Sequence, residues 1–238
     1  MRSRSRRTDA CYAVNPAEPA SCGNFARRLL KFFSNLNPIS LPLQKIIYEV
    51  GAPLEHVYFV EGGVASIITK MTNGDSIEAG MIGSEGVVGL PALLGRKTSG
   101  QHVIVQAPLT ALRMDVADCK TAFEQSAAVR EVLLRYTATL LDIASQTAAC
   151  NQLHSLKERC ARWILMMHDR LQTEAMPLTH EFFAIMLGTR RVRITEVAVD
   201  LQRTGLIRYQ RGLVTVLDHS ALAIAACECY RDHDRLSN

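Results

Sequence analysis

The 238-residue sequence contains no run of eighteen apolar residues, which is about the length that a membrane-spanning helix needs. Its basic start, Met1 to Arg7, is not followed by the apolar stretch of a signal peptide. The seven cysteines are odd in number and scattered along the chain, as in a protein of a reducing compartment. We therefore expect a cytoplasmic protein with free thiols and no contact with a membrane.

Motifs of the common enzyme chemistries are also missing. No Ser/His/Asp order, phosphate-cradling loop or metal-ligand spacing rises above background, so we predict no catalytic activity. The composition, with 48% hydrophobic and 21% charged residues, is that of an ordinary globular protein and excludes wholesale disorder. The length corresponds to one or two domains.

The charge is concentrated in one short segment. The chain has a formal net charge of +4, and residues 188–211 alone carry six arginines against Glu196 and Asp200, which is also +4. Residues 25–120 are balanced, with nine basic against eight acidic side chains. A local basic patch is typical of a nucleic-acid site, although a solvated helix face with spare arginines would have the same composition.

The N-terminal half is patterned as strands, after a flexible arm that we expect at residues 1–24. The apolar runs expected to be strands are 46–50, 57–60, 65–68, 102–106 and 111–114. The turn signals between them are Gly51–Pro53, Gly62-Gly63, Asn73-Gly74 and Gly95. Asn73-Gly74 predicts a two-residue hairpin turn. Many short strands at this spacing favour a β-sandwich or β-roll.

From Asp118 to Cys150 the chain has no Pro or Gly, and the apolar period becomes helical. A stripe with the period of a coiled coil follows this helix and consists of Val129, Leu133, Tyr136, Leu140, Ile143 and Thr147. A narrow stripe suits a partner helix, so we predict homodimerisation through these residues. The alternative is a helix packed on the core of its own domain.

A capping box begins the next helix. Ser155 and Glu158 are spaced so that each side chain can satisfy a free backbone N–H, and the helix is expected to run to about Leu171. Residues 172–177 are expected to form a short loop.

Two short helices are predicted after this loop. Thr179 is placed to cap the first, which Gly188 ends in a left-handed conformation. Thr189 is placed to cap the second, which runs from Arg190 to about Arg203. Two short helices joined by a tight turn that contains glycine form a helix-turn-helix.

The second of these helices has two distinct faces at about 100° per residue. The inward face consists of Ile194, Val197, Ala198 and Leu201. On the outward side an arginine can pair with guanine, Glu196 can accept from cytosine N4 and Val192 can touch a thymine methyl. The side chains that we predict to contact DNA here are Thr189, Arg190, Arg191, Val192, Arg193, Thr195, Glu196 and Arg203. An ordinary helical hairpin with a charged face is the alternative.

A β-hairpin is predicted directly after this helix, with strands at 206–209 and 213–218. Such a wing would place Arg208 and Arg211 against phosphates, and contacts of that kind position a protein without reading sequence.

In this order the segments resemble the Crp/Fnr family of bacterial transcription regulators, over about residues 25–220. Tyr48–Val64 and Gly83–Gly89 look like parts of that family's sensor domain, and 118–150 corresponds to its dimerisation helix. Leu178–Arg191 and Leu201–Ile207 are similar to its DNA-binding motif. The resemblance implies an α+β fold with four parts: the arm at 1–24, a cyclic-nucleotide-binding-like β-roll (a jelly roll) at 25–120, a dimerisation helix at 121–151 and a winged helix-turn-helix domain at 152–238.

The resemblance implies a homodimeric transcription regulator that binds a palindromic operator in double-stranded DNA, contacts RNA polymerase and responds to an unknown small effector in the roll. At the DNA-reading positions this chain has Arg191, Val192 and Glu196, which differ from the residues of the best-known family members. The resemblance therefore implies a half-site sequence different from theirs. The rival hypothesis is an effector-binding module whose winged domain holds a protein instead of DNA.

The expected effector positions depart from those of the cyclic-nucleotide binders in the family. Those proteins hold the ribose with a Gly-Glu pair and the cyclic phosphate with an arginine. Here the matching positions are Gly89-Leu90 and Gly100-Gln101, so both charged partners are missing. Burying an anion without a cation is costly. We therefore expect an effector pocket at these four residues, and we do not expect cyclic AMP in it.

No other cofactor is predicted. The iron–sulfur branch of the family uses a tight N-terminal cysteine cluster, whereas this chain has only Cys11, Cys22 and the distant Cys119. No heme ligand can be assigned. Cys227, Cys229 and His233 fall one ligand short of a closed metal site, so a C-terminal helix with free thiols is expected instead.

Overall fold

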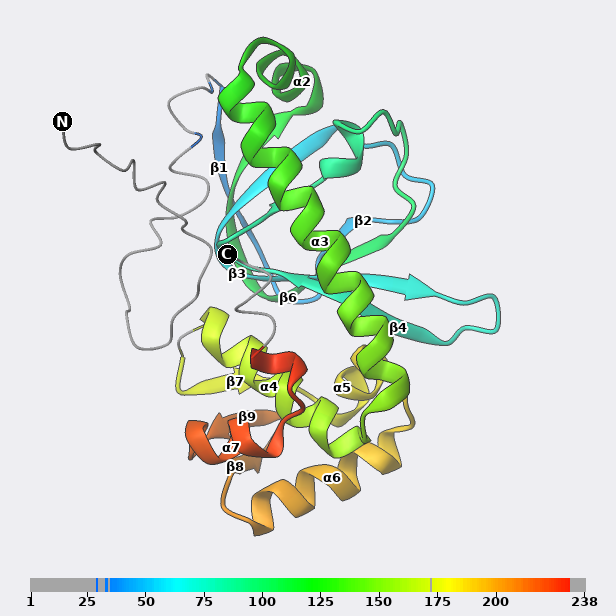
Figure 1. The fold of residues 1–238 in the computed structure, drawn as a ribbon, viewed down its shortest axis with the longest axis vertical. Coiled ribbons are helices and arrows are strands. Elements are labelled where there is room, and N and C mark those ends of the chain that lie inside the picture. Colours follow the sequence, from blue (N-terminus) through cyan, green and yellow to red (C-terminus); the bar gives the residue numbers. More distant parts are fainter. Residues whose placement is uncertain (1–28, 30–32, 34, 172, 232–238) are drawn as a thin grey trace, which may run out of the picture.

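The computed structural model describes residues 29, 33, 35–171 and 173–231. A β-roll and a smaller domain of helices and short strands follow one another along the longest axis, and a long helix runs beside the roll down to the smaller domain (Figure 1). The predicted α+β fold is confirmed. The predicted arm at 1–24 lies outside the described residues. Among the described helices, none is long and apolar enough to cross a membrane.

The roll is built on two long antiparallel strands, β3 (His56–Lys70) and β6 (His102–Asp115). Two strands pair with β6, namely β1 (Asn37–Leu41) and β2 (Ile46–Tyr48). Two others pair with β3, namely β4 (Ser76–Ile82) and β5 (Val87–Val88), and the short helix η1 (Leu90–Ala92) follows β5. The apolar runs that we expected as separate strands at 57–60 and 65–68 are one strand, and so are those at 102–106 and 111–114.

The double glycine at 62–63 does not form the predicted turn. It lies inside β3, where the pairing with β6 shifts register between Val60 and Ala65. Gly63 has a φ of +80°, and a Cβ there would lie 2.1 Å from the carbonyl oxygen of Pro108. Glycine is therefore required for a bulge that bends the strand without ending it.

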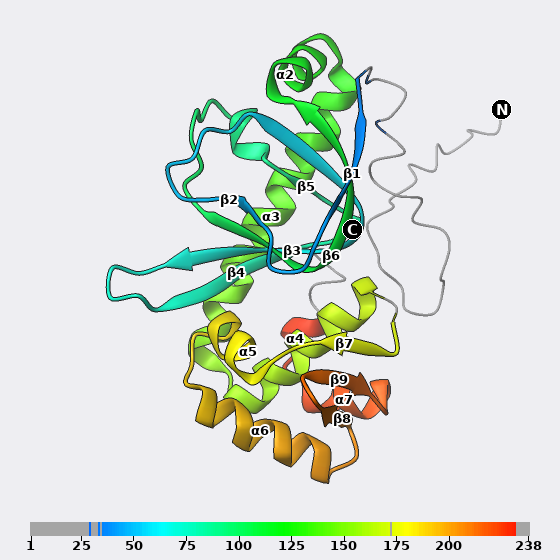
Figure 2. The ribbon, with the colours of Figure 1, turned by 180° about the vertical axis from the view of Figure 1, so that it is seen from behind.

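The hairpin between β3 and β4 lies where Asn73-Gly74 predicts a turn. Lys70 pairs with Ser76, and Met71 N donates to Asp75 O at 2.8 Å, so the turn is one residue longer than the predicted two-residue type. In both views this hairpin projects from the roll above α5 (His180–Met186) (Figures 1 and 2).

The helix predicted at 118–150 is two helices, α2 (Val116–Gln125) and α3 (Ala127–Leu153). Ser126 between them is extended, with φ −113° and ψ 111°, and its side chain accepts from Val129 N. Serine competes for helix backbone groups and favours caps, which explains a break without Pro or Gly. The dimerisation helix predicted at 121–151 therefore corresponds to α3 alone.

The smaller domain, which we call the winged domain, spans residues 156–225. Its helices are α4 (Leu156–Leu171), α5, α6 (Arg191–Arg203) and α7 (His219–Ala225). Its sheet consists of β7 (Ala175–Pro177), β9 (Leu213–Val216) and β8 (Ile207–Gln210) in that order. The predicted wing is confirmed as the β8–β9 hairpin, whereas the loop predicted at 172–177 includes strand β7. The predicted capping box is also present, since Ser155 N donates to Glu158 Oε2 at 2.8 Å.

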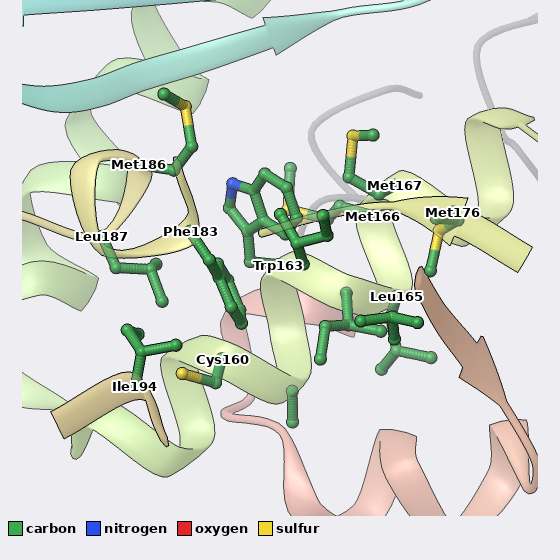
Figure 3. Close-up of a cluster of buried hydrophobic side chains, with 14 of the residues drawn as sticks. Cys160, Trp163, Leu165, Met166, Met167, Met176, Phe183, Met186, Leu187 and Ile194 are labelled. Atoms are coloured by element: carbon green, nitrogen blue, oxygen red, sulfur yellow. The ribbon is translucent and has the colours of Figure 1, made fainter. Parts of the chain in front are cut away.

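The core of the winged domain is centred on α4. The rings of Trp163 and Phe183 are in contact, with centroids 4.9 Å apart, and Ile194 of α6 lies close by (Figure 3). The same buried cluster includes Val64 and Met81 of the roll. The two domains therefore share one hydrophobic core, which fixes the winged domain against β3 and β4.

Candidate nucleic-acid interface and effector cavity

A side-chain cap and a left-handed glycine shape the helix-turn-helix. Thr179 Oγ1 accepts from Phe182 N at 3.2 Å, so the predicted cap of α5 is confirmed. Gly188 has a φ of +60° and faces Ile77 of β4, whose Cδ1 would lie 2.7 Å from a Cβ. Thr189 does not cap α6 as predicted, because α6 begins one residue later, with Arg190 at its N-cap.

The two faces of α6 are divided as the sequence predicts. Ile194, Ala198 and Leu201 are buried, and Val197 is partly buried. On the outer face Val192 is 67% exposed and Val199 is 59% exposed. Of the predicted DNA contacts on the turn and helix, Thr189 and Thr195 are half-buried, whereas the exposed ones are Arg190, Arg191, Val192, Arg193, Glu196 and Arg203. An exposed apolar side chain between arginines suits a groove that offers both base edges and methyl groups.

Four of the predicted contact residues also have side-chain partners within the chain. Thr195 Oγ1 lies 3.0 Å from His180 Nδ1 and donates to Arg191 O, so it holds α6 on α5. Arg203 donates to Asp200 at 2.9 Å, and Arg193 lies 3.8 Å from Glu196. These exposed ion pairs cost little to open, so both arginines remain available to a partner.

Sequence reasoning missed Lys157 of α4. Its ammonium lies 2.5 Å from Asp200 Oδ2 and so joins α4 to α6. No sequence spacing signals this pair, because 43 positions separate the two residues.

The wing is fixed to the start of α5. Tyr209 donates a hydrogen bond from its hydroxyl to Leu178 O, and its ring packs at a tilt against His180 with centroids 4.4 Å apart. Arg211 and Gly212 form the tip with φ values of +51° and +76°. Arg208 and Arg211 are both exposed, as the phosphate-contact prediction requires. The contact itself stays a prediction.

A buried carboxyl group joins the two domains. Glu78 of β4 accepts hydrogen bonds from Ser66 Oγ at 2.5 Å and from Trp163 Nε1 at 3.0 Å. Burial raises the pKa of Glu78 to about 7, although these hydrogen bonds and two nearby arginines act in the opposite direction. The carboxyl group can therefore change its charge near neutral pH inside the interface between the domains.

A second link between the domains is ionic. Arg170 at the end of α4 donates to Glu85 Oε1 at 2.9 Å. Burial alone would raise the pKa of Glu85, but Arg170 and hydrogen bonds from backbone N–H groups outweigh it, so the pKa lies below its usual value. Sequence reasoning had assigned neither Glu78 nor Glu85 a role, because their partners lie in the other domain.

The α3 stripe that we assigned to a partner helix packs against the roll of its own chain. The assignment of these residues to a dimer interface is therefore wrong. Val129, Leu133 and Tyr136 are almost fully buried against the roll of their own chain, together with Val57 and Phe59. Of the other stripe residues, Ile143 is buried, Leu140 packs against the roll, and Thr147 accepts a hydrogen bond from Arg162 of α4. Periodicity shows that a face is buried but not what buries it. The alternative that the sequence left open, a helix on its own core, is the one observed.

The opposite face of α3 is exposed and carries its own stripe. Leu134 and Leu141 are 46% and 65% exposed. The members of this outer stripe, again at alternate spacings of four and three, are Leu134, Ala138, Leu141, Ser145 and Ala148.

A cavity of about 220 Å³ lies between the roll and α3. Its walls are mostly apolar and include Leu54, Ile82 and Val103 from the roll and Leu140 from α3. None of the described residues that line it carries a charge. Of the predicted effector positions, Gly89, Leu90 and Gln101 line the cavity and Gly100 does not. The effector role of these residues stays a prediction.

The two C-terminal cysteines are free thiols, as we expected, but the predicted C-terminal helix is interrupted, with Cys227 in the break and Cys229 at the start of a short helical turn. Helix α7 ends at Ala225, and Cys227 and Cys229 follow it with both side chains buried. His233, the third residue of the sequence pattern, lies outside the described residues.

Comparison with known proteins agrees with this geometry. The model described as a cyclic nucleotide-binding domain matches residues 38–126, and the model described as a Crp-like helix-turn-helix domain matches residues 158–224. The global nitrogen regulator of Synechococcus elongatus is 23% identical over 212 residues, which is 82% of this chain and 95% of that protein. The CRP-like cAMP-activated global transcriptional regulator of Mycobacterium tuberculosis is 22% identical, over 79% of this chain and 87% of that protein. The structure of FixK2 from Bradyrhizobium japonicum has a TM-score of 0.71 at 17% identity, over 82% of this chain and 98% of that one.

A cyclic-nucleotide-binding-type roll joined by a long helix to a helix-turn-helix with an exposed second helix defines a two-domain DNA-binding regulator of transcription. The chain belongs to the Crp/Fnr family of transcription regulators.

Proposed function

We propose that this regulator binds a palindromic DNA operator as a homodimer and that a small apolar molecule in the roll modulates its affinity. The observation that supports this most strongly is the outer face of α6. Arg191, Val192 and Glu196 point away from the body of the protein while Ile194 and Ala198 anchor the helix. A recognition helix needs this division, with its groove-facing side chains near the N-terminus.

In this proposal each exposed side chain has a defined role. Arg191 pairs with guanine, Glu196 accepts from cytosine N4, and Val192 contacts a thymine methyl. Arg208 and Arg211 of the wing contact phosphates and set the register of the protein on the duplex. RNA polymerase as a further partner is implied only by family membership.

We place the dimer seam on the outer stripe of α3 rather than on the stripe that we first assigned. Leu134 and Leu141 supply apolar area there, and the small side chains of Ala138, Ser145 and Ala148 allow two helices to approach closely. With the seam along α3, the two recognition helices are related by a dyad and can enter half-sites about 34 Å apart.

The cavity supports an uncharged and largely apolar effector. Its polar groups are few, namely the side chains of Tyr48, Ser99, Gln101 and Thr137. An anion such as cyclic AMP would be buried there without a cation, at a high cost. Because α3 forms one wall, a ligand that prefers one position of α3 shifts the balance between dimer arrangements.

Selection of bound duplexes from a random DNA pool, with and without candidate ligands, tests this function. We expect enrichment of a two-fold symmetric site and altered enrichment with apolar ligands but not with cyclic AMP. The variant Arg191→Ala should relax the preference at one base position, whereas Arg208→Ala should weaken binding to all sequences alike. No enrichment, together with salt-insensitive binding to a protein, would favour the rival hypothesis of a protein-contact module.

A further inference from the structure

We propose a structural zinc site at the junction of α3 with the C-terminal segment, formed by Cys150, His154, Cys227 and Cys229. The three sulfur atoms and one imidazole nitrogen all lie within 4.8 Å of one another. Cys150 and His154 lie at the end of α3, whereas both other ligands follow α7. None of the four lines the effector cavity or lies on the outer face of α6.

The distances fit a tetrahedral ion. With bonds of about 2.3 Å to sulfur and about 2.0 Å to nitrogen, the edges of the tetrahedron are about 3.8 Å between sulfurs and about 3.5 Å between sulfur and nitrogen. In the structure Cys150 Sγ and Cys227 Sγ are 3.5 Å apart, and Cys229 Sγ lies 3.6 Å from His154 Nδ1. The space between these four atoms is large enough for one metal ion and too small for a multi-iron cluster.

The surrounding groups orient the ligands as they do in metal centres. The second ring nitrogen of His154, Nε2, lies 3.1 Å from Glu228 Oε1. A carboxylate that accepts from one imidazole nitrogen leaves the other free to bind a metal, and metal-binding histidines commonly have such a partner. Gln146 donates to Cys229 Sγ at 2.9 Å.

Burial and charge support the same assignment. Cys119 and Cys160 are also buried, but each packs among the apolar side chains of a main core. The three sulfurs of the site instead form a separate cluster with one another. Three thiolates and Zn²⁺ leave one negative charge, and the buried guanidinium of Arg162 interacts electrostatically with Cys150. Within the described residues, Arg162 Nε has no hydrogen-bond partner.

Thiolate and imidazole ligands in a tetrahedral arrangement select zinc, and four protein ligands make a closed, structural site. Only one residue separates Cys227 from Cys229, which is fewer than zinc-binding cysteines usually have between them. That residue is Glu228, whose carboxylate lies within hydrogen-bond distance of His154. The ion would tie the end of α3, where the chain turns into α4, to the segment after α7. It would therefore fix the winged domain relative to the helix that borders the roll.

Metal content of the full-length chain, purified under reducing and oxygen-free conditions with zinc supplied, is the first test. We expect one zinc ion per chain by elemental analysis. Exchange for Co²⁺ should give the strong visible bands of a tetrahedral thiolate site. Removal of zinc by a chelator should lower the midpoint of thermal unfolding, and added zinc should restore it.

Matched variants separate a metal site from a merely packed cluster. Cys150→Ser and Cys227→Ser should lose stoichiometric zinc, whereas the buried control Cys119→Ala should keep it. A ligand variant can fail to fold, so Glu228→Gln, which keeps all four ligands, is the second test. It should weaken zinc affinity by about 10- to 100-fold, as loss of such a partner does elsewhere.

Three results would overturn the proposal. The first is reduced, folded protein that binds no zinc in competition with a fluorescent chelator. The second is stoichiometric zinc retained by both Cys150→Ser and Cys227→Ser. The third is a Cys150–Cys227 disulfide in protein prepared without oxygen, which mass spectrometry would detect. None of these readouts depends on DNA binding, so the zinc site and the proposed function can fail separately.

Discussion

Replacing Glu78 by glutamine should remove a pH dependence from the stability of the protein. The carboxyl group lies between Ser66 of the roll and Trp163 of the winged domain. Burial raises its pKa from 4.5 to about 7, even though both hydrogen bonds and the positive charges of Arg170 and Arg162 favour the carboxylate. Ionisation of Glu78 therefore works against the contact between the two domains.

The sign and size follow from the two pKa values. The folded protein binds this proton more tightly than the unfolded chain, whose carboxyl groups titrate near 4.5. The stabilisation is complete below that pH and is lost as the pH rises through about 7. A difference of about 2.5 units, at about 1.4 kcal/mol per unit, gives an upper value of about 3.5 kcal/mol for the loss.

Urea unfolding at several pH values between 4.5 and 8 measures this loss. Trp163 is the single tryptophan of the sequence and donates to Glu78, so its fluorescence follows both unfolding and the titration in the native state. The wild-type protein should become less stable across this range, and its native emission should change with a midpoint near pH 7. In Glu78→Gln the fluorescence titration should be absent, and the loss of stability between these pH values should be smaller by up to about 3.5 kcal/mol.

The control is Glu174→Gln, which alters an exposed carboxyl group of the winged domain and should keep the wild-type profile. If Glu78→Gln retained both the wild-type stability slope and the fluorescence titration, the assignment of the pH dependence to Glu78 would be refuted.

Three further predictions concern the other surfaces of the molecule. Arg208→Ala and Arg211→Ala should each reduce the slope of log affinity for DNA against log salt by about 0.9, because each removes about one phosphate contact; titration at several salt concentrations measures this. Leu134→Glu should make the proposed dimer monomeric in sedimentation analysis, since it places a charge in the proposed seam at a residue that does not line the cavity. Phe183→Ala should lower the free energy of unfolding by about 3–5 kcal/mol in urea, because its ring is fully buried on Trp163.

Each of these variants has a matched control. Arg96→Ala in the roll should leave the salt slope unchanged, and a slope equally insensitive to Arg208 would remove the wing from the interface. Leu43→Glu alters an exposed leucine of the roll and should keep the oligomeric state of the wild type; if Leu134→Glu also kept it, the seam would lie elsewhere. Ile185→Ala on the exposed side of α5 should cost far less than Phe183→Ala, and equal costs would contradict the packing in Figure 3.

The helix-turn-helix and its wing could be predicted closely from the sequence, because local chemistry determines them. Thr179 caps a helix through a backbone group three residues away, and Gly188 adopts a left-handed conformation that favours glycine. The division of α6 into a buried and an exposed face follows from helical periodicity alone.

Where local signals were ambiguous, the sequence could not predict the outcome. Gly62-Gly63 is compatible with a turn or with a bulge, and the pairing of β3 with β6 decides for the bulge. The stripe of α3 that begins at Val129 is compatible with a partner or with the chain's own core. The apolar side chains of the roll, such as Phe59, cover it and leave Leu134 on the exposed face.

The sequence by itself determined the class of protein and the division of α6 into a buried and an exposed face, since these depend on order and on spacings of a few residues. Only the tertiary structure brought Glu78 to Trp163, and Cys150 to Cys227. The partners in each pair lie more than seventy positions apart, and no periodicity extends over that distance. Contacts of this kind arise because two domains and the end of the chain pack together, and they carry the predicted pH dependence and the proposed zinc site.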